Sequence, residues 1–140
     1  MAEQSCSATS AVMTAVYDRN VHTIASHVPL KISLPLGTCA ADERTELNPV
    51  DMMAMGLASC MLILMGKAAV AEKLDILGAR ADVSYKLDNY RITSFNVDIH
   101  LPRKFHANEQ TKLEAASRDC PLFLAINPDV NVNVTFDWPK

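Results

Sequence analysis

The longest apolar run of the chain lies in residues 48–72, which read NPVDMMAMGLASCMLILMGKAAVAE. Asn48 can accept a hydrogen bond from a first-turn amide, Pro49 suits the first helical position, and Asp51 places negative charge beside the exposed amides. From residue 52 to residue 65 every side chain is apolar or small, so a helix built from this run must be buried on all sides. The segment therefore predicts a long core helix that begins at Asn48 or Pro49.

Size and composition exclude several classes of protein. The chain has 140 residues and a formal net charge of -3, which predicts one domain over residues 1–140 whose core needs no disulfides. Lys and Arg are scattered without a basic run, so nucleic acid is not an expected partner. The apolar run is short for a membrane span and Lys67 follows it closely, so no membrane partner is expected either. Residues 1–10 lack a secretory signal, and we expect a cytoplasmic protein.

Alternation of apolar and polar side chains predicts strands on both sides of the helix. The predicted strands cover residues 8–17, 21–26, 30–36, 81–87, 92–101 and 130–136. A second helix is expected from Asn108, and a short one over residues 122–126, because Pro121 cannot continue a helix without losing a hydrogen bond. Segregated hairpins with inserted helices predict an α+β fold with antiparallel sheets, since parallel units would need strands and helices that alternate one for one.

Four cysteines are candidates for chemistry, and none of them shows CxxC or zinc-ribbon spacing. They are Cys6, Cys39, Cys60 and Cys120. A lone thiol in an apolar helix is more often packing than chemistry. Cys60 lies twelve residues past Asn48, too far for the helix dipole to act on it, so a reactive Cys60 would need a cation from elsewhere in the chain. The histidines show no metal-ligand spacing, and no metal or other cofactor is predicted. His22 is expected at the surface.

One set of motifs runs through nearly the whole chain. It consists of Asn48-Pro49-x-Asp51-Met52, Ala54, Gly56, Cys60 and the pair Cys120-Pro121. This set resembles the OsmC/Ohr family of thiol peroxidases, named for osmotically inducible protein C and organic hydroperoxide resistance. The resemblance implies an OsmC-like fold, in which antiparallel sheets wrap around long central helices of an intertwined homodimer.

The resemblance also implies roles for individual residues. Cys60 corresponds to the peroxidatic cysteine of the family, and Cys120 to the cysteine that resolves it as a Cys60 to Cys120 disulfide. Arg19 lies where the family keeps the arginine that stabilises the thiolate, and Asp51 matches a second acidic position. From the residues alone, a solvated hairpin charge is the favoured interpretation of Arg19, whereas for Asp51 a helix-start charge and a role in the site are equally supported. The implied activity is reduction of organic, and also inorganic, hydroperoxides, with recycling by an external dithiol or a lipoylated protein.

One position departs from the family pattern. Ohr-type members carry a glutamate directly after the proline, where this chain has Val50. This difference points to a divergent OsmC-like subgroup and puts Ohr-like efficiency in doubt. It also keeps two alternatives open: a non-catalytic redox-sensing or apolar-ligand-binding protein, and a structural dimer module with inert thiols. Cys6 and Cys39 match no motif and are expected to be incidental.

Overall fold

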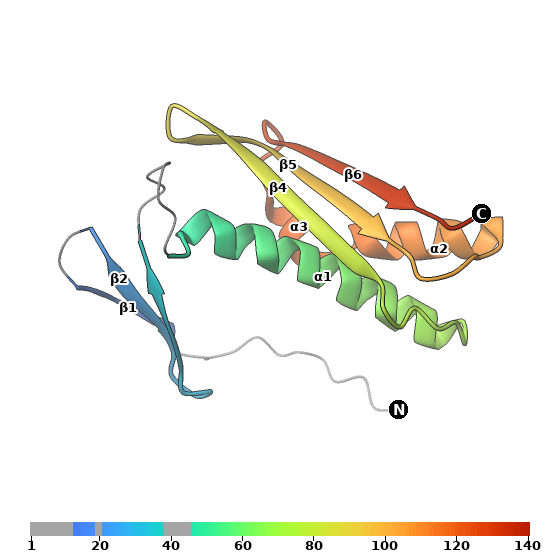
Figure 1. The fold of residues 1–140 in the computed structure, drawn as a ribbon, viewed down its shortest axis with the longest axis horizontal. Helices are drawn as coiled ribbons and strands as arrows, with labels where there is room; N and C mark the ends of the chain where they lie inside the picture. Colours follow the sequence, from blue (N-terminus) through green and yellow to red (C-terminus); the bar gives the residue numbers. More distant parts are fainter. Residues whose placement is uncertain (1–12, 19–20, 38–45) are drawn as a thin grey trace. The chain divides into compact units, whose positions relative to one another are not determined.

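The computed structural model describes residues 13–18, 21–37 and 46–140, which belong to two compact units, Met1–Met52 and Met53–Lys140. A three-stranded sheet lies in each unit (Figure 1). The combination of sheets and helices confirms the predicted α+β class. The prediction of a single domain is not tested by this division, and it stays a prediction.

The first unit contains a meander of three strands. These are β1 (Met13–Tyr17), β2 (Thr23–His27) and β3 (Ile32–Leu36). They pair antiparallel in the order β1-β2-β3, as the sequence predicted, and Ser26 and Ser33 form a hydrogen bond across β2 and β3 at 2.9 Å. Residues 8–12 of the predicted first strand, and Arg19 in its hairpin turn, lie outside the described residues.

Helix α1 (Pro49–Ala71) confirms the predicted core helix and its start. The side chains of Asn48 and Asp51 each accept a hydrogen bond from the backbone N–H of the other residue. The Asp51 N–H donates to Asn48 Oδ1 at 2.9 Å, and the Asn48 N–H donates to Asp51 Oδ2 at 3.1 Å. This capping box sets the first residue of the helix.

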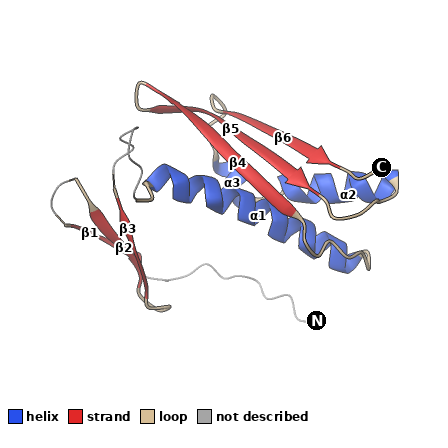
Figure 2. Cartoon of the chain, viewed as in Figure 1, coloured by secondary structure: helices blue, strands red, loops and turns tan. Residues whose placement is uncertain are grey.

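The second unit combines a sheet with α1 and two further helices, all on one side of the sheet (Figure 2). Its elements after α1 are β4 (Arg80–Asp88), β5 (Arg91–His100), α2 (Ala107–Arg118), α3 (Pro121–Ala125) and β6 (Asn131–Asp137). β4 and β5 form a hairpin whose turn residues Asn89 and Tyr90 have φ of 49° and 63°. Two successive left-handed residues are typical of a tight two-residue turn.

The sheet of the second unit is mixed, whereas the sequence predicted antiparallel sheets. β6 pairs with β5 in parallel. Helices α2 and α3 stand between these strands in the chain and form the crossover that a parallel pair requires. The alternation in residues 130–136 predicted the strand but carried no information on its direction.

The core of the second unit lies between the sheet and the helices. Phe95, Val97 and Ile99 on β5 are fully buried, and from α1 they meet Met61 and Met65. The alternate residues of β5 are polar, so the sheet has one dry and one wet face as predicted.

On length and composition alone, α1 could cross a membrane. The core helix of a globular domain meets the same two criteria, so they do not by themselves indicate a span. Six residues of α1 are buried inside the chain: Ala54, Leu57, Ala58, Met61, Met65 and Ala69. We therefore describe α1 as a core helix.

Candidate active site

The structure brings Cys60 and Cys120 together, although they are sixty residues apart in the sequence. Cys60 lies in the middle of α1 and is partly exposed, whereas Cys120 directly precedes α3 and is fully buried. Both thiols are free, and Cys60 packs against the buried cluster that contains Cys120, close enough for Cys120 to raise the pKa of Cys60. A small oxidant can therefore reach Cys60 from solvent, and within the part of the chain that the structure describes Cys120 is the one other thiol.

The Cys-Pro pair explains why α3 begins where it does. Pro121 occupies the first helical position, where a missing N–H costs nothing. Cys120 is the N-cap residue, and its Sγ accepts a hydrogen bond from the Phe123 N–H at 3.4 Å. The turn that begins α3 thus holds the Cys120 sulfur in place.

The surroundings of Cys60 favour its neutral thiol. Burial raises the pKa of Cys60, and the hydrogen bond to Cys120 and charge on Cys120 raise it further. The backbone N–H of Leu122 donates to Cys60 and lowers this pKa. Among the described residues it is the one group that acts on the Cys60 pKa in that direction. A peroxidatic Cys60 therefore needs a cation in addition to these groups.

The resemblance implies that Arg19 is this cation, and Arg19 lies outside the described residues. Asp18, Val21 and His22 on either side of it are described. Val21 has a φ of 60°, which is a rare conformation for a β-branched residue. The Asp18 N–H donates to the His22 carbonyl at 2.8 Å.

His22 is less exposed than the sequence suggested. Its side chain is 20% exposed, and its Nε2 lies 3.1 Å from Glu46 Oε1. Its Nδ1 lies 3.9 Å from Asp18 Oδ2. Nε2 has no hydrogen-bond partner among the described residues, so it approaches Glu46 without an aligned hydrogen bond. The Glu46 carboxylate also covers Gly37, where a Cβ would lie 2.5 Å from Glu46 Oε2.

Asp51 has a clear structural role in the capping box of α1. It also makes a further interaction beyond those two hydrogen bonds. The geometry therefore supports the helix-start interpretation of Asp51, and its catalytic role stays a prediction. Val50, in the position of the family glutamate, lies on the same turn of α1 and is half-buried.

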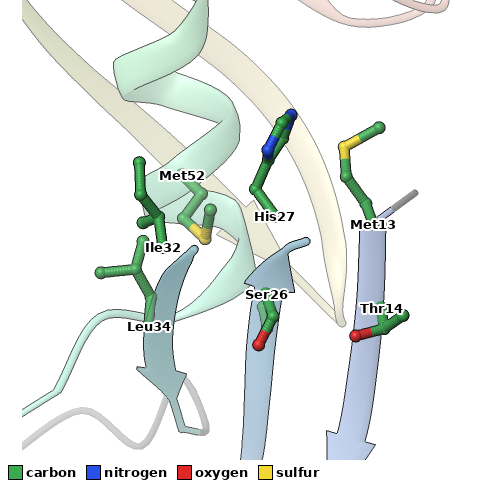
Figure 3. Close-up of a pocket in the computed structure, with 8 residues that line it drawn as sticks. Met13, Thr14, Ser26, His27, Ile32, Leu34 and Met52 are labelled. Atoms are coloured by element: carbon green, nitrogen blue, oxygen red, sulfur yellow. The ribbon is translucent and has the colours of Figure 1, made fainter. Parts of the chain in front are cut away.

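Two pockets are lined by residues other than the two cysteines. The first, of about 310 Å³, lies in the first unit, and its surface is almost entirely apolar. Met13, Ile32, Leu34 and Met52 gather around it with His27 (Figure 3). The second, of about 600 Å³, lies in the second unit and has both polar and apolar walls. Neither of these pockets is lined by Cys60 or Cys120.

Metal ligands do not cluster in the described ranges 13–18, 21–37 and 46–140. No group of three His, Cys, Asp or Glu side chains there could hold a metal ion.

Sequence reasoning identified both thiols but missed the Leu122 N–H. A backbone donor has no side-chain signature, so no residue type at position 122 could have marked it. In the sequence, Glu46 stood out only as one of the carboxylates nearest to Val50. Its contact with His22 depends on how the first unit folds.

Comparison with known proteins identifies the fold. The family model for OsmC-like proteins matches residues 41–135. A candidate osmotic stress induced and detoxification response protein from Psychrobacter arcticus is 24% identical, with 89% of this chain and 94% of that chain covered and a TM-score of 0.79. The organic hydroperoxide resistance protein OsmC from Legionella pneumophila is 20% identical, with 90% and 95% covered and a TM-score of 0.70.

A third solved structure, the organic hydroperoxide resistance protein OhrB of Bacillus subtilis, is 19% identical, with 93% of this chain and 99% of that chain covered and a TM-score of 0.68. At such identities the three likenesses show the fold alone. No curated protein matches the chain.

Proposed function

Because this chain belongs to the OsmC-like protein family, we propose that it is a cysteine-based thiol peroxidase that reduces organic, and also inorganic, hydroperoxides. The observation that carries the proposal is the proximity of two free thiols, Cys60 and Cys120, of which only Cys60 is reached by solvent. Such a pair supplies both the thiol that a peroxide oxidises and the thiol that resolves the product.

The first step takes place at Cys60. Its thiolate attacks the distal oxygen of the hydroperoxide, so that an S–O bond forms and the O–O bond breaks. The leaving alkoxide takes a proton and departs as an alcohol, or as water when the substrate is hydrogen peroxide. The sulfur is oxidised by two electrons to a sulfenic acid.

The second step uses Cys120. Its sulfur attacks the sulfenic sulfur, an S–S bond forms, and the sulfenic oxygen leaves as water with the Cys120 proton. An external dithiol, such as a lipoyl group, then reduces the disulfide by thiol–disulfide exchange and is itself oxidised to a disulfide. A cytoplasmic location, where such reductants keep thiols reduced, is part of the proposal.

Arg19 is the proposed source of the positive charge that Cys60 requires. The need for it follows from the described surroundings, since burial and Cys120 both favour the neutral thiol. Asp51 is proposed to assist in the site in addition to capping α1. A homodimer, with each active site at the subunit boundary, completes the proposal.

Peroxide consumption by defined variants tests the proposal. With an organic hydroperoxide and either dithiothreitol or dihydrolipoamide, Cys60→Ser should lose all turnover above the reaction without protein. Cys120→Ser should still form a sulfenic acid at Cys60, which dimedone traps and mass spectrometry detects. Cys39→Ser is the matched control that removes a cysteine outside the pair, and it should keep wild-type turnover. Equal turnover in wild type and Cys60→Ser would refute the proposal.

A second candidate function is a non-catalytic, apolar-ligand-binding protein. The apolar pocket of about 310 Å³ in the first unit favours it, because pockets of this size and character hold small ligands. The raised pKa of Cys60 and the absence of a carboxylate at position 50, where the chain has Val50, also favour a non-catalytic protein. Absence of Cys60-dependent turnover, together with saturable binding of an apolar fluorescent probe that Leu34→Asp abolishes, would establish this candidate instead.

A further inference from the structure

A β-bulge shapes one wall of the larger pocket, the one of about 600 Å³ in the second unit. Thr93 is the extra residue of this bulge on β5, since Ile92 and Ser94 on either side of it pair with consecutive residues of β4. The Thr93 hydroxyl donates to the Lys86 carbonyl at 3.4 Å. Because of the extra residue, Ile92 and Phe95 both pack against the core although they are three residues apart. Bulges re-aim side chains in this way and occur often beside active sites.

The lining of this pocket combines an apolar wall with polar groups. The apolar wall comes from β5, α1 and the segment after α3, and it consists of Met53, Ile92, Phe95, Ile126 and Val130. The charged groups of the lining are Arg91 and Asp129. Pockets of this volume that join apolar surface with a few polar groups are typical small-molecule sites. The pocket therefore offers one cation, one anion and an apolar surface to a ligand.

No ion pair neutralises Arg91 or Asp129 within the described part of the chain. Asp88 is the cross-strand partner of Arg91, and no ion pair joins those two side chains either. Strands β5 and β6 run in parallel side by side (Figure 1), with Ser94 level with Asn131. Arg91 and Asp129 each stand a few residues before that level. The two opposite charges thus lie at the same end of neighbouring strands and are both available to a ligand.

A tight turn before β6 holds Asp129 in place. The Asp129 N–H donates to Asn127 Oδ1 at 2.8 Å, and the Val130 N–H donates to the Asn127 carbonyl at 2.9 Å. An asparagine that accepts from the backbone two residues on is a common way to fix a turn. The Asp129 backbone is therefore ordered by Asn127, while its carboxylate makes no such contact with a described residue.

We propose that this pocket binds a zwitterion with an apolar side chain, the chemistry that free α-amino acids and short peptides share. The Arg91 guanidinium receives the carboxylate, which its planar fork of N–H donors fits in a bidentate manner. The Asp129 carboxylate accepts hydrogen bonds from the ammonium group, and the apolar side chain lies on the wall around Ile92. This site goes beyond the proposed peroxidase, because neither cysteine lines the pocket.

The test is an NMR titration of the isotope-labelled full chain with leucine and, separately, with leucyl-leucine. Saturable shifts are expected in the backbone amide signals of residues 91–95 and 129–131, and none in the first unit. The ligand that binds more tightly identifies the source of the zwitterion as a free amino acid or a dipeptide. Absence of saturable shifts in these residues with both ligands at millimolar concentration would overturn the inference.

Two variants assign each charge of the ligand to its partner. Arg91→Gln should lower the affinity for the tighter ligand about tenfold relative to the amide of that ligand, because the amide has no carboxylate for Arg91 to bind. Asp129→Asn should lower it about tenfold relative to the N-acetyl form, because that form has no ammonium group. Both variants replace exposed side chains, and unchanged amide signals elsewhere in the chain confirm that each one is folded.

Arg80→Gln is the matched control for the loss of positive charge. Arg80 is an exposed arginine of the same sheet that pairs with Asp82 and does not line the pocket. This variant should leave both affinity ratios at their wild-type values. Equal ratios in Arg91→Gln and Arg80→Gln, or in Asp129→Asn and the wild type, would overturn the inference. Loss of peroxide turnover in Cys60→Ser has no bearing on it.

Discussion

Cys120 lies beside Cys60 and disfavours negative charge on the Cys60 sulfur. The pKa of Cys60 is raised first by burial and then by Cys120. At a given pH the thiolate fraction of Cys60 is therefore smaller than that of an ordinary thiol. A peroxidase built on this pair gains activity as pH rises toward the Cys60 pKa.

Removal of Cys120 should make Cys60 more acidic. In Cys120→Ala, the hydrogen bond and the charge that raise the Cys60 pKa are both lost, while the opposing Leu122 N–H remains. The midpoint of Cys60 alkylation against pH should therefore fall. It should stay above that of an ordinary thiol, because burial is the largest cause of the raised Cys60 pKa and is kept in the variant. The measurement uses iodoacetamide and peptide mass analysis in the background with Cys6→Ser and Cys39→Ser. A midpoint that stays at the parent value would show that the thiols do not interact.

At the scale of elements, α1 depends on its first turn. Asn48 is almost completely buried and shares two hydrogen bonds with Asp51. The free amides of this turn would otherwise lack partners in a place that water does not reach. The capping box thus fixes both the start of the helix and the position of Val50.

Loss of this cap should destabilise the protein. Asn48→Ala and Asp51→Ala should each lower the free energy of unfolding by about 1 kcal/mol, within the usual range of roughly 0.5–2 kcal/mol for N-cap changes. Urea unfolding followed by circular dichroism measures the loss.

Asn48→Ala and Asp51→Ala are expected to lose similar free energy of unfolding, but only Asp51→Ala removes a carboxylate. With the proposed catalytic role, Asp51→Ala should lower kcat/KM per folded molecule, and Asn48→Ala should not. An equal kcat/KM in both variants would leave Asp51 with the capping role alone.

At the scale of the whole molecule, α1 has an apolar face that the second unit leaves exposed. Met55, Ile63 and Val70 are 48%, 60% and 67% exposed, and they recur at helical spacing on one face with Ser59 between them. An apolar face of this kind marks an interaction surface. A second copy of the chain is the predicted partner, in agreement with the homodimer that the family resemblance implies.

A charge on this face should separate the copies. Ile63→Lys replaces an exposed apolar side chain whose burial in a dimer would contribute roughly 1.5–3 kcal/mol per copy. Sedimentation at micromolar concentration should show a dimer for the wild type and a shift to monomer for Ile63→Lys. Lys104→Glu, a charge reversal at an exposed residue outside α1, serves as the control. A wild-type monomer under these conditions would contradict the prediction.

Residue types and their spacing predicted the elements well, since helix and strand periodicity depend on neighbours along the chain. The start of α1 at Asn48-Pro49, the strands of both hairpins and the break at Cys120-Pro121 were all visible in this way. The direction of β6 was not, because alternation is the same in parallel and antiparallel strands.

The sequence alone determined the α+β class, the buried helix and the two cysteines that matter, because these follow from local pattern and motif. Only the tertiary structure decided that the cysteines meet, that Cys120 is buried while Cys60 is partly exposed, and that burial raises the pKa of Cys60. Those properties depend on which distant segments pack together and how much water they exclude, and neither is encoded in the order of neighbouring residues.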